Sequence, residues 1–301
     1  DEPVEIEPTI IVEIPVISEP IEVVIAQPEI EIETEETNRS FIPLVKTNSV
    51  NLDEGLDLVD SGQIVEARQQ LSDALLSGVL TESEVAQARG VLTDLSDTLV
   101  FSPYITTDDP YSIEYIIRSG DTLSGIVQKM GLQVDWRFIQ RINRIDHASA
   151  IRPGQNLKLI TGPFHAIVDK KAFRIDLYQG DGESQVFVRS YRVGLGEFNS
   201  TPTGLFKVRR NSKLLNPMWV NPRTAEIFAS NNPLNPIGER WVGLEGMEER
   251  NKDLSGLGIH GTIEPESIGT NASMGCVRML ENDVEIVYEM LLEGVSTVEI
   301  H

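Results

Sequence analysis

The chain has 301 residues, of which 40% are hydrophobic, and this length is enough for two or three folded domains. Its formal net charge of −22 excludes nucleic-acid binding by phosphate neutralisation, and an anionic membrane surface would repel it. No apolar run in the sequence reaches the roughly 18–20 residues of a membrane span, and the single cysteine, Cys276, excludes an intrachain disulfide.

Residues 1–48 predict an extended, disordered, Pro-rich spacer. Residues 1–50 hold 12 Asp and Glu against 2 Lys and Arg, and the acidic residues alternate with Ile and Val. Such alternation favours a strand, but like charges repel one another and the prolines remove donors from a strand ladder, so an edge strand is the weaker alternative. Because Asp1 is not a start Met, an upstream signal peptide or membrane anchor, since removed, is a further expectation.

Residues 49–100 predict a small helical hairpin bundle. Apolar residues recur at helical spacing from Leu56 to Val79 around a break at Ser61-Gly62, and a further helix is predicted over Val85–Leu99. The stretch that begins Gly62-Gln63-Ile64-Val65-Glu66-Ala67 resembles one tetratricopeptide unit, and a single unit is too short to be stable alone. The region is therefore either a structural spacer or a surface for a protein partner.

Residues 101–112 form a turn-rich linker, and residues 113–161 predict the order strand, helix, helix, strand. The predicted strands are Ile113–Ile117 and Leu157–Ile160. The first helix starts after Asp121-Thr122 and stops at Gly131, and the second ends near Asn143.

The motif Gly120-Asp121-Thr122-Leu123-Ser124, followed by Asn143 and by Arg152-Pro153-Gly154-Gln155-Asn156-Leu157, resembles a LysM module along its whole length. The resemblance implies a βααβ fold that binds N-acetylglucosamine-containing glycans, chiefly bacterial peptidoglycan or chitin. It places the glycan between the first strand–helix loop and the second helix–strand loop. The contact residues that it implies are Gly120, Asp121, Thr122, Leu123, Ile151, Arg152 and Pro153. A copy that only packs against a neighbouring domain is the alternative.

Residues 162–301 predict a mostly β domain with one clear helix. The predicted strands, separated by turns, are His165–Val168, Arg174–Tyr178, Gln185–Val193, Gly204–Arg209 and Thr297–Ile300. Asp283 is the predicted N-cap of a helix that runs through Glu293 and stops at Gly294.

Cys276 stands in the stretch Ser273-Met274-Gly275-Cys276-Val277-Arg278-Met279, sixteen positions after His260. A thiolate attacks carbonyl carbon, and a neighbouring histidine can take the thiol proton. Gly275 would leave its own amide and that of Cys276 open as oxyanion donors, to which the Ser273 hydroxyl could add. The planar fork of Arg278 suits a substrate carboxylate. The residues alone leave an inert, buried cysteine as the alternative.

A metal site is not expected, and no cofactor is predicted. The sequence holds four histidines, none of which stands at metal-ligand spacing with Cys276: His147, His165, His260 and His301.

Several ordered motifs are closely similar to the L,D-transpeptidase catalytic domain of the YkuD type, over about residues 163–300. They are Thr201–Phe206, Asn235–Trp241, Ile259–Thr262, Ser267–Gly269, Ser273–Met279 and Asp283-Val284. The resemblance implies a β-sandwich-like domain in which Cys276 is the nucleophile and His260 is the base. It assigns oxyanion and substrate binding to Ser273, Gly275, Arg278 and Gly261.

The implied substrate is the peptidoglycan stem peptide. Cys276 would attack the carbonyl at the L-centre of the third residue of a tetrapeptide stem and release D-Ala, and the amine of a second diamino acid would resolve the thioester into a 3→3 cross-link. Members are typically acylated by carbapenems. Many members carry His where this chain has Met274, so His260 must supply the basic function alone. No Asp or Glu stands at an obvious motif position, and a backbone carbonyl is expected to orient the His260 ring.

The two resemblances name the same polymer. The sequence therefore predicts an enzyme that cross-links peptidoglycan in the bacterial cell envelope, in the periplasm or the wall, with a LysM module that raises the local substrate concentration. Three alternatives stay open: an L,D-carboxypeptidase with water as acceptor, an enzyme that attaches a protein lysine to the wall, and a non-catalytic wall-binding scaffold.

Overall fold

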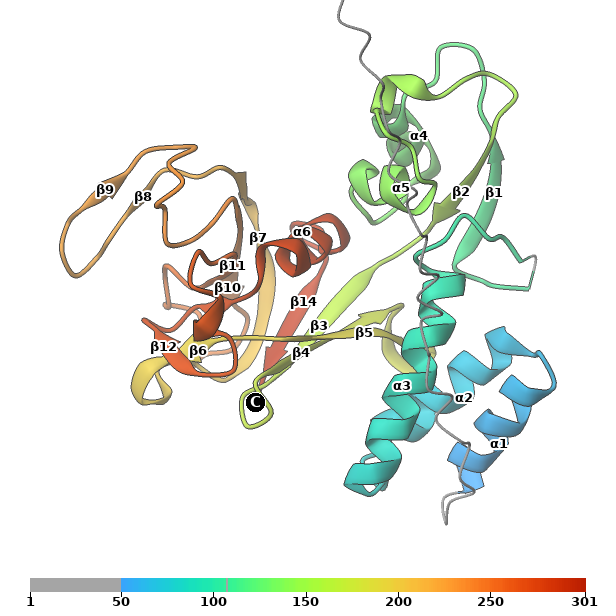
Figure 1. Cartoon of the computed structure of the whole chain (residues 1–301), viewed down its shortest axis with the longest axis horizontal. Helices are drawn as coiled ribbons and strands as arrows, with labels where there is room; N and C mark the ends of the chain where they lie inside the picture. The colour runs from blue at the N-terminus through green and yellow to red at the C-terminus, as the bar shows by residue number, and fades with distance from the viewer. Residues whose placement is uncertain (1–49, 107) are drawn as a thin grey trace, which may run out of the picture. The chain divides into compact units, whose positions relative to one another are not determined.

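The computed structural model describes residues 50–106 and 108–301, which Figure 1 shows in chain order. The acidic spacer predicted over residues 1–48 lies outside the described residues. Among the helices described, none is both long enough and apolar enough to cross a bilayer.

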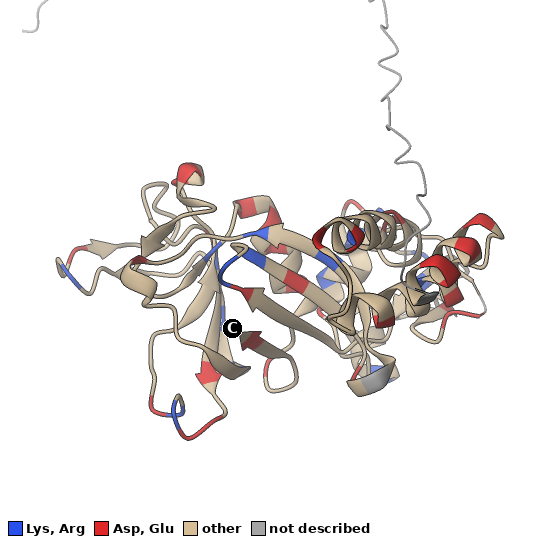
Figure 2. Cartoon of the chain, turned by 90° about the horizontal axis from the view of Figure 1, so that it is seen from below, with Lys and Arg blue, Asp and Glu red and all other residues tan. Residues whose placement is uncertain are grey.

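The first described part consists of three helices: α1 (Val50–Asp60), α2 (Ile64–Leu76) and α3 (Glu82–Leu99). Helix α3 begins with a capping box, in which Thr81 Oγ1 accepts the Glu84 N–H and the Glu84 carboxylate accepts the Thr81 N–H. Figure 2 shows acidic residues in red along these helices. The predicted stripe through Val79 was too long, because Gly78 turns the backbone at φ +70° and leaves Val79 75% exposed.

The helices are packed on the β-rich part of the chain. Tyr178 and Phe187 share one apolar cluster with buried residues of α2 and α3. Ser72 Oγ of α2 accepts the Phe187 N–H at 2.9 Å, and Arg89 of α3 forms an ion pair with Asp176. The helices therefore pack on the β-rich part, and both the structural spacer and the protein partner stay predictions.

The next part has the predicted LysM order, with two antiparallel strands around two helices. Its elements are β1 (Ser112–Ile116), α4 (Leu123–Met130), α5 (Trp136–Ile142), a 3₁₀ turn η1 (Ala148–Ala150) and β2 (Asn156–Ile160). Thr122 caps α4 by accepting the Gly125 N–H, and Gly131 ends it at φ +64°.

The LysM part is docked on its neighbours by both apolar and polar contacts. Phe138 of α5 packs edge-on against Phe101 and Phe164, each at 5.7 Å between ring centroids. Lys158 of β2 donates to the carbonyls of Leu99 and Ser102 at the C-terminal end of α3. Burial lowers the pKa of Lys158 to about 8.

The C-terminal part is mostly β, as predicted, and is built on one eight-stranded sheet in the order β13-β11-β10-β7-β14-β3-β4-β5. The strands are β3 (Phe164–Asp169), β4 (Arg174–Gln179), β5 (Val186–Arg192), β7 (Gly204–Leu215), β10 (Arg240–Gly246), β11 (Gly258–His260), β13 (Val277–Arg278) and β14 (Thr297–Ile300). Two short pairs complete it: β6 (Leu195–Gly196) with β12 (Asn271–Ser273), and β8 (Trp219–Val220) with β9 (Ile227–Phe228). The sandwich-like arrangement stays a prediction.

The helix of this domain, α6 (Glu281–Met290), differs from the predicted one at both ends. Leu280 occupies the N-cap position, so the assignment of Asp283 as N-cap was wrong. Asp283 lies in the first turn, where the positive end of the helix dipole stabilises a carboxylate. The helix ends at Met290, since Leu291 has an extended backbone, and the Glu293 carboxylate beyond it accepts backbone N–H groups from the β7 residues Ser212 and Lys213.

A buried ion pair tests how firmly the helices are held. Arg68 of α2 binds Asp109 through two hydrogen bonds of 2.7 and 3.2 Å, and both side chains are almost fully buried. We expect Asp109→Ala to lower the free energy of unfolding by roughly 3–5 kcal/mol, because it strands a buried guanidinium. The matched change Asp97→Ala, at a pair with Arg189 in which the carboxylate is half exposed, should cost less than about 1 kcal/mol. Equal losses in urea titrations of the two variants would contradict this account.

Candidate functional site

Strands β11 and β13 pair in parallel at one edge of the large sheet, with Ile259 opposite Val277 and His260 opposite Arg278. Ile259 and Val277 are fully buried. Side chains alternate along a strand, so His260 and Arg278 lie on the other face, and Cys276 directly precedes β13. The structure thus brings together the two predicted motifs, sixteen residues apart in the sequence.

His260 is buried and held by the backbone. Its Nδ1 lies 2.6 Å from the carbonyl oxygen of Gly261, which confirms the expectation that a backbone carbonyl orients the ring. Since a carbonyl only accepts, Nδ1 carries the hydrogen and Nε2 keeps the basic lone pair. Burial lowers the pKa of His260 to about 4, although hydrogen bonds with the Gly261 and Ile237 backbone act in the opposite direction.

Trp241 is a site residue to which the sequence analysis gave no role. It lies opposite His260 in the β10–β11 register, and the two rings stack at 5.7 Å with an interplanar angle of 16°. The indole lies against Gly258 and Gly243, where added Cβ atoms would come within 2.6 and 3.0 Å of it. The sequence features that could have pointed to Trp241 are Gly243 and Gly258, which pair across β10 and β11. Because they lack side chains, they make room for the indole beside the imidazole.

Cys276 is half-buried, and its Sγ donates a hydrogen bond to the Gly256 carbonyl at 3.3 Å. Burial raises the pKa of the thiol, while a backbone hydrogen bond from Gly258 and the charge of Arg278 lower it in part. A neutral thiol at the start of β13 therefore lies next to β11, the strand that carries a neutral imidazole. This state suits transfer of the proton during attack on a carbonyl, rather than a thiolate–imidazolium pair formed beforehand.

The turn before Cys276 is closed by Ser273. Its hydroxyl donates to the Cys276 carbonyl at 2.6 Å and accepts the Gly275 N–H at 3.1 Å. Gly275 has φ +129°, a conformation that only glycine adopts readily. The donors of Ser273 and Gly275 are therefore engaged within the turn, and their roles in binding an oxyanion stay predictions that require these hydrogen bonds to be exchanged.

Arg278 contributes a positive charge to the site. Its guanidinium lowers the pKa of both His260 and Cys276, so it opposes the imidazolium and favours the thiolate. Its Nη1 forms an ion pair of 2.9 Å with Glu264, whose side chain is half exposed. Its Nε is buried and has no hydrogen-bond partner among the described residues. A substrate carboxylate could replace Glu264 there, and this role stays a prediction.

The two predicted glycan-binding loops of the LysM part lie side by side, because Ile117 exchanges backbone hydrogen bonds with Gly154 and Gln155. Gly120, Arg152 and Pro153 are exposed.

The other predicted loop residues have structural partners. Asp121 accepts hydrogen bonds from the Tyr115 hydroxyl and the Arg118 N–H, which lower the pKa of its carboxyl. Ile151 is half-buried, and Leu123 is buried in the core. Sugar contacts at these positions stay predictions.

Alkylation of Cys276 tests the protonation state of the site. Burial raises the pKa of the Cys276 thiol above its ordinary value of 9.0. The rate of alkylation by iodoacetamide should therefore keep rising with pH up to and beyond pH 9, without a plateau near neutrality. Arg278→Gln should slow alkylation at every pH below the plateau, because it removes the charge that favours the thiolate. A wild-type rate that is already level between pH 6 and 8 would instead indicate a preformed ion pair.

Residues 163–300 match the family model of the L,D-transpeptidase catalytic domain (YkuD), and residues 115–159 match that of the LysM domain. The chain is similar to "Putative L,D-transpeptidase YqjB" of Bacillus subtilis (strain 168), with 34% identity over 105 residues, 35% of this chain and 54% of that protein. It is also similar to "Putative L,D-transpeptidase YkuD" of the same strain, with 26% identity over 179 residues, 57% of this chain and 89% of that one. The chain thus spans about half the length of the first of these two relatives.

Two solved structures are also similar to the chain. For an L,D-transpeptidase from Mycobacterium smegmatis the TM-score is 0.36, with 16% identity over 49% of this chain and 63% of that one. For Bd1075 of Bdellovibrio bacteriovorus the TM-score is 0.33, with 19% identity over 46% of this chain and 47% of that one. At these scores the structural likeness adds nothing to the match with the family models.

Proposed function

We propose that this chain, which carries an L,D-transpeptidase catalytic domain of the YkuD family and a LysM domain, forms 3→3 cross-links in peptidoglycan. The observation that carries the proposal is the parallel pairing of β11 with β13, which sets His260 beside Arg278 and next to the Cys276 turn. The family supplies the reaction class, and the neutral thiol and imidazole fit its first step.

In that first step, Sγ of Cys276 attacks the carbonyl carbon at the L-centre of the third residue of a tetrapeptide stem. The thiol proton passes to Nε2 of His260 as the S–C bond forms. The Cys276 N–H is the donor that we assign to the developing oxyanion. The tetrahedral intermediate then collapses, the C–N bond to D-Ala breaks, and the imidazolium returns its proton to the leaving amine. A thioester on Cys276 remains.

In the second step, the amine of a diamino acid on another stem attacks the thioester carbonyl. Neutral His260 accepts a proton from this amine, the C–S bond breaks as the imidazolium returns that proton to Sγ, and the new amide bond is the 3→3 cross-link. A pKa of about 4 leaves Nε2 of His260 unprotonated at neutral pH and open to a proton in both steps, but it also makes the imidazole a weak base, so the proton moves only as the new bond to carbon forms. The imidazolium formed in the first step is a strong acid for the same reason, and it readily protonates the leaving amine.

The LysM domain is proposed to hold the enzyme on glycan strands of the bacterial cell envelope. The exposed positions Gly120, Arg152 and Pro153 lie on two adjacent loops that are free to meet a sugar chain. Binding there would raise the concentration of stem peptides near Cys276, since the second encounter becomes effectively intramolecular.

Mass spectrometry of products tests the reaction. A purified disaccharide-tetrapeptide is incubated with the wild-type chain and with Cys276→Ala. We expect a dimer that has lost one D-Ala with the wild type alone, because the thioester cannot form without Sγ. Tripeptide without dimer would identify a carboxypeptidase instead. No product with either protein would contradict both activities and leave attachment of a protein lysine or a wall-binding scaffold.

A further inference from the structure

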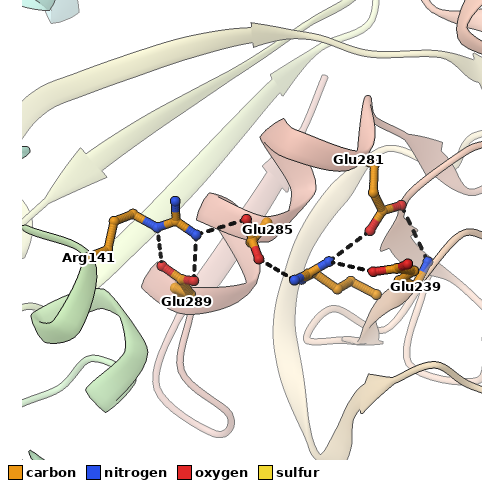
Figure 3. Close-up of polar contacts among 6 residues, drawn as sticks. Arg141, Glu239, Glu281, Glu285 and Glu289 are labelled. Atoms are coloured by element: carbon orange, nitrogen blue, oxygen red, sulfur yellow. Dashed lines mark hydrogen bonds and ion pairs between the residues drawn. The ribbon is translucent and has the colours of Figure 1, made fainter. Parts of the chain in front are cut away.

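A chain of alternating charges runs from the LysM domain to the catalytic domain (Figure 3). Helix α6 carries Glu281, Glu285 and Glu289 at spacings of four residues, so the three carboxylates share one face. Arg240 of β10 pairs with Glu281 at 2.9 Å and also with Glu285. Arg141 of α5 pairs with Glu285 at 2.9 Å and with Glu289 at 2.6 Å.

At the LysM end of this row of ion pairs, Arg141 is bound tightly to Glu289. The guanidinium of Arg141 binds Glu289 through two parallel hydrogen bonds of 2.6 and 2.7 Å, the geometry in which an Arg–carboxylate pair is strongest. The side chain of Glu289 is only 6% exposed. The Asp135 N–H, at the start of α5, also donates to the Glu289 carbonyl at 3.0 Å. Helix α5 is therefore fixed to α6 through both side chain and backbone.

At the other end of this row of ion pairs, Glu281 lies against Gly261, the residue whose carbonyl orients the His260 ring. Glu281 Oε2 fills the space at Gly261 and Gly238, where added Cβ atoms would lie 2.1 and 2.4 Å from it. Gly261 supplies the carbonyl that holds His260 Nδ1, and its own N–H donates to the Arg240 carbonyl at 3.3 Å. Arg240 thus contacts Gly261 directly through its backbone and indirectly through Glu281.

The charges of the cluster are not balanced. Two guanidinium groups, on Arg141 and Arg240, serve four carboxylates, because Arg240 also pairs with Glu239 at 3.4 Å. Without Arg141, Glu289 would lose this guanidinium and Glu285 would keep only Arg240, so the Arg240 guanidinium would be drawn from Glu281 towards Glu285. Arg240 is only 16% exposed, so solvent screens this redistribution incompletely.

We propose that the LysM domain, besides binding glycan, positions His260 through Arg141, Glu285, Arg240 and Glu281. These four are positioning residues for the transpeptidase reaction, and the inference rests on the proposed function of the site. An enzyme whose LysM domain is undocked would therefore be slow even on a soluble stem peptide that offers no glycan to the LysM loops.

The test compares Arg141→Ala with Arg137→Ala in the full chain. Both residues lie on α5 and both changes remove one positive charge, but the ion pair that Arg137 makes is with Asp135, within its own domain. We expect Arg141→Ala to lower kcat on a soluble tetrapeptide by roughly 3- to 30-fold with little change in KM. Arg137→Ala should leave kcat unchanged, and Arg141→Lys should recover part of the loss.

The titration of the His260 ring, followed by NMR, provides a readout that does not depend on the substrate. In Arg141→Ala the midpoint should rise from about 4 towards the ordinary 6.5, because a released imidazole is better solvated. Wild-type kcat and midpoint in Arg141→Ala would overturn the inference and leave Arg141 as a docking contact. If the wild type turns over no stem peptide, the proposed function fails, and the titration still decides whether the coupling exists.

Glu281→Gln covers the case in which Arg141→Ala does not fold. It keeps the size of the side chain beside Gly261 and removes only its charge, so it should reproduce the loss of kcat and the rise of the His260 midpoint. If Glu281→Gln folds and retains both wild-type values, the inference is wrong. Where all variants fold, the double change Arg141→Ala/Glu281→Gln should lower kcat by less than the product of the two single effects, since both act on one chain.

Discussion

The parallel pairing of β11 with β13 is the constraint on which the site depends. It places His260 opposite Arg278 and buries Ile259 against Val277, so the face towards the core fixes the face that carries His260 and Arg278. A shift of one residue would move every side chain of β13 to the other face. The next strand inward, β10, then adds Trp241 beside His260, while the turn through Gly275 leads Cys276 into β13, the strand on the other side of β11.

The electrostatics of the site follow from the same burial. Desolvation disfavours the charged forms of both groups, and it therefore raises the pKa of Cys276 and lowers that of His260. The charge of Arg278 lowers both pKa values, so it favours the neutral imidazole and the thiolate. In the proposed mechanism it therefore stabilises the negative charge on Sγ when the proton moves. The hydrogen bond from Sγ to Gly256 gives the resting thiol a partner other than the imidazole. In the proposed mechanism the site therefore holds no thiolate–imidazolium pair until the thiol attacks.

The sequence predicted the features that depend on local chemistry. Helix α4 begins after Thr122 and ends at Gly131, as expected, because a side-chain oxygen caps the first turn and glycine tolerates a left-handed end. The ring of His260 binds a backbone carbonyl, as expected from the lack of a nearby acid in the motifs. Features set by distant partners were missed. Glu293 lies beyond the helix and accepts backbone N–H groups of β7. The Trp241 ring packs against glycines on two strands. Ser273 accepts the Gly275 N–H within a turn whose shape no motif predicts.

The contacts between the parts of the chain were also beyond prediction from the sequence. Arg141 and Glu289 stand 148 residues apart, and nothing in either local pattern marks the other as its partner. Apolar spacing predicted the helices that precede the LysM domain but not that Phe187 of the β-rich part would share their core. These contacts join the LysM domain to α6 and the helices to the large sheet, which the predicted roles of anchor and spacer do not require.

The central claim is that a neutral His260 takes the proton of a neutral Cys276 as the thiol attacks. The most direct measurement is the rate of acylation by the tetrapeptide in single-turnover experiments in H₂O and in D₂O, at a pH well above the His260 pKa. The account predicts a slower rate in D₂O, because the proton is in transfer in the transition state. Equal rates in the two solvents would contradict it and would indicate that a thiolate is already present before the substrate binds.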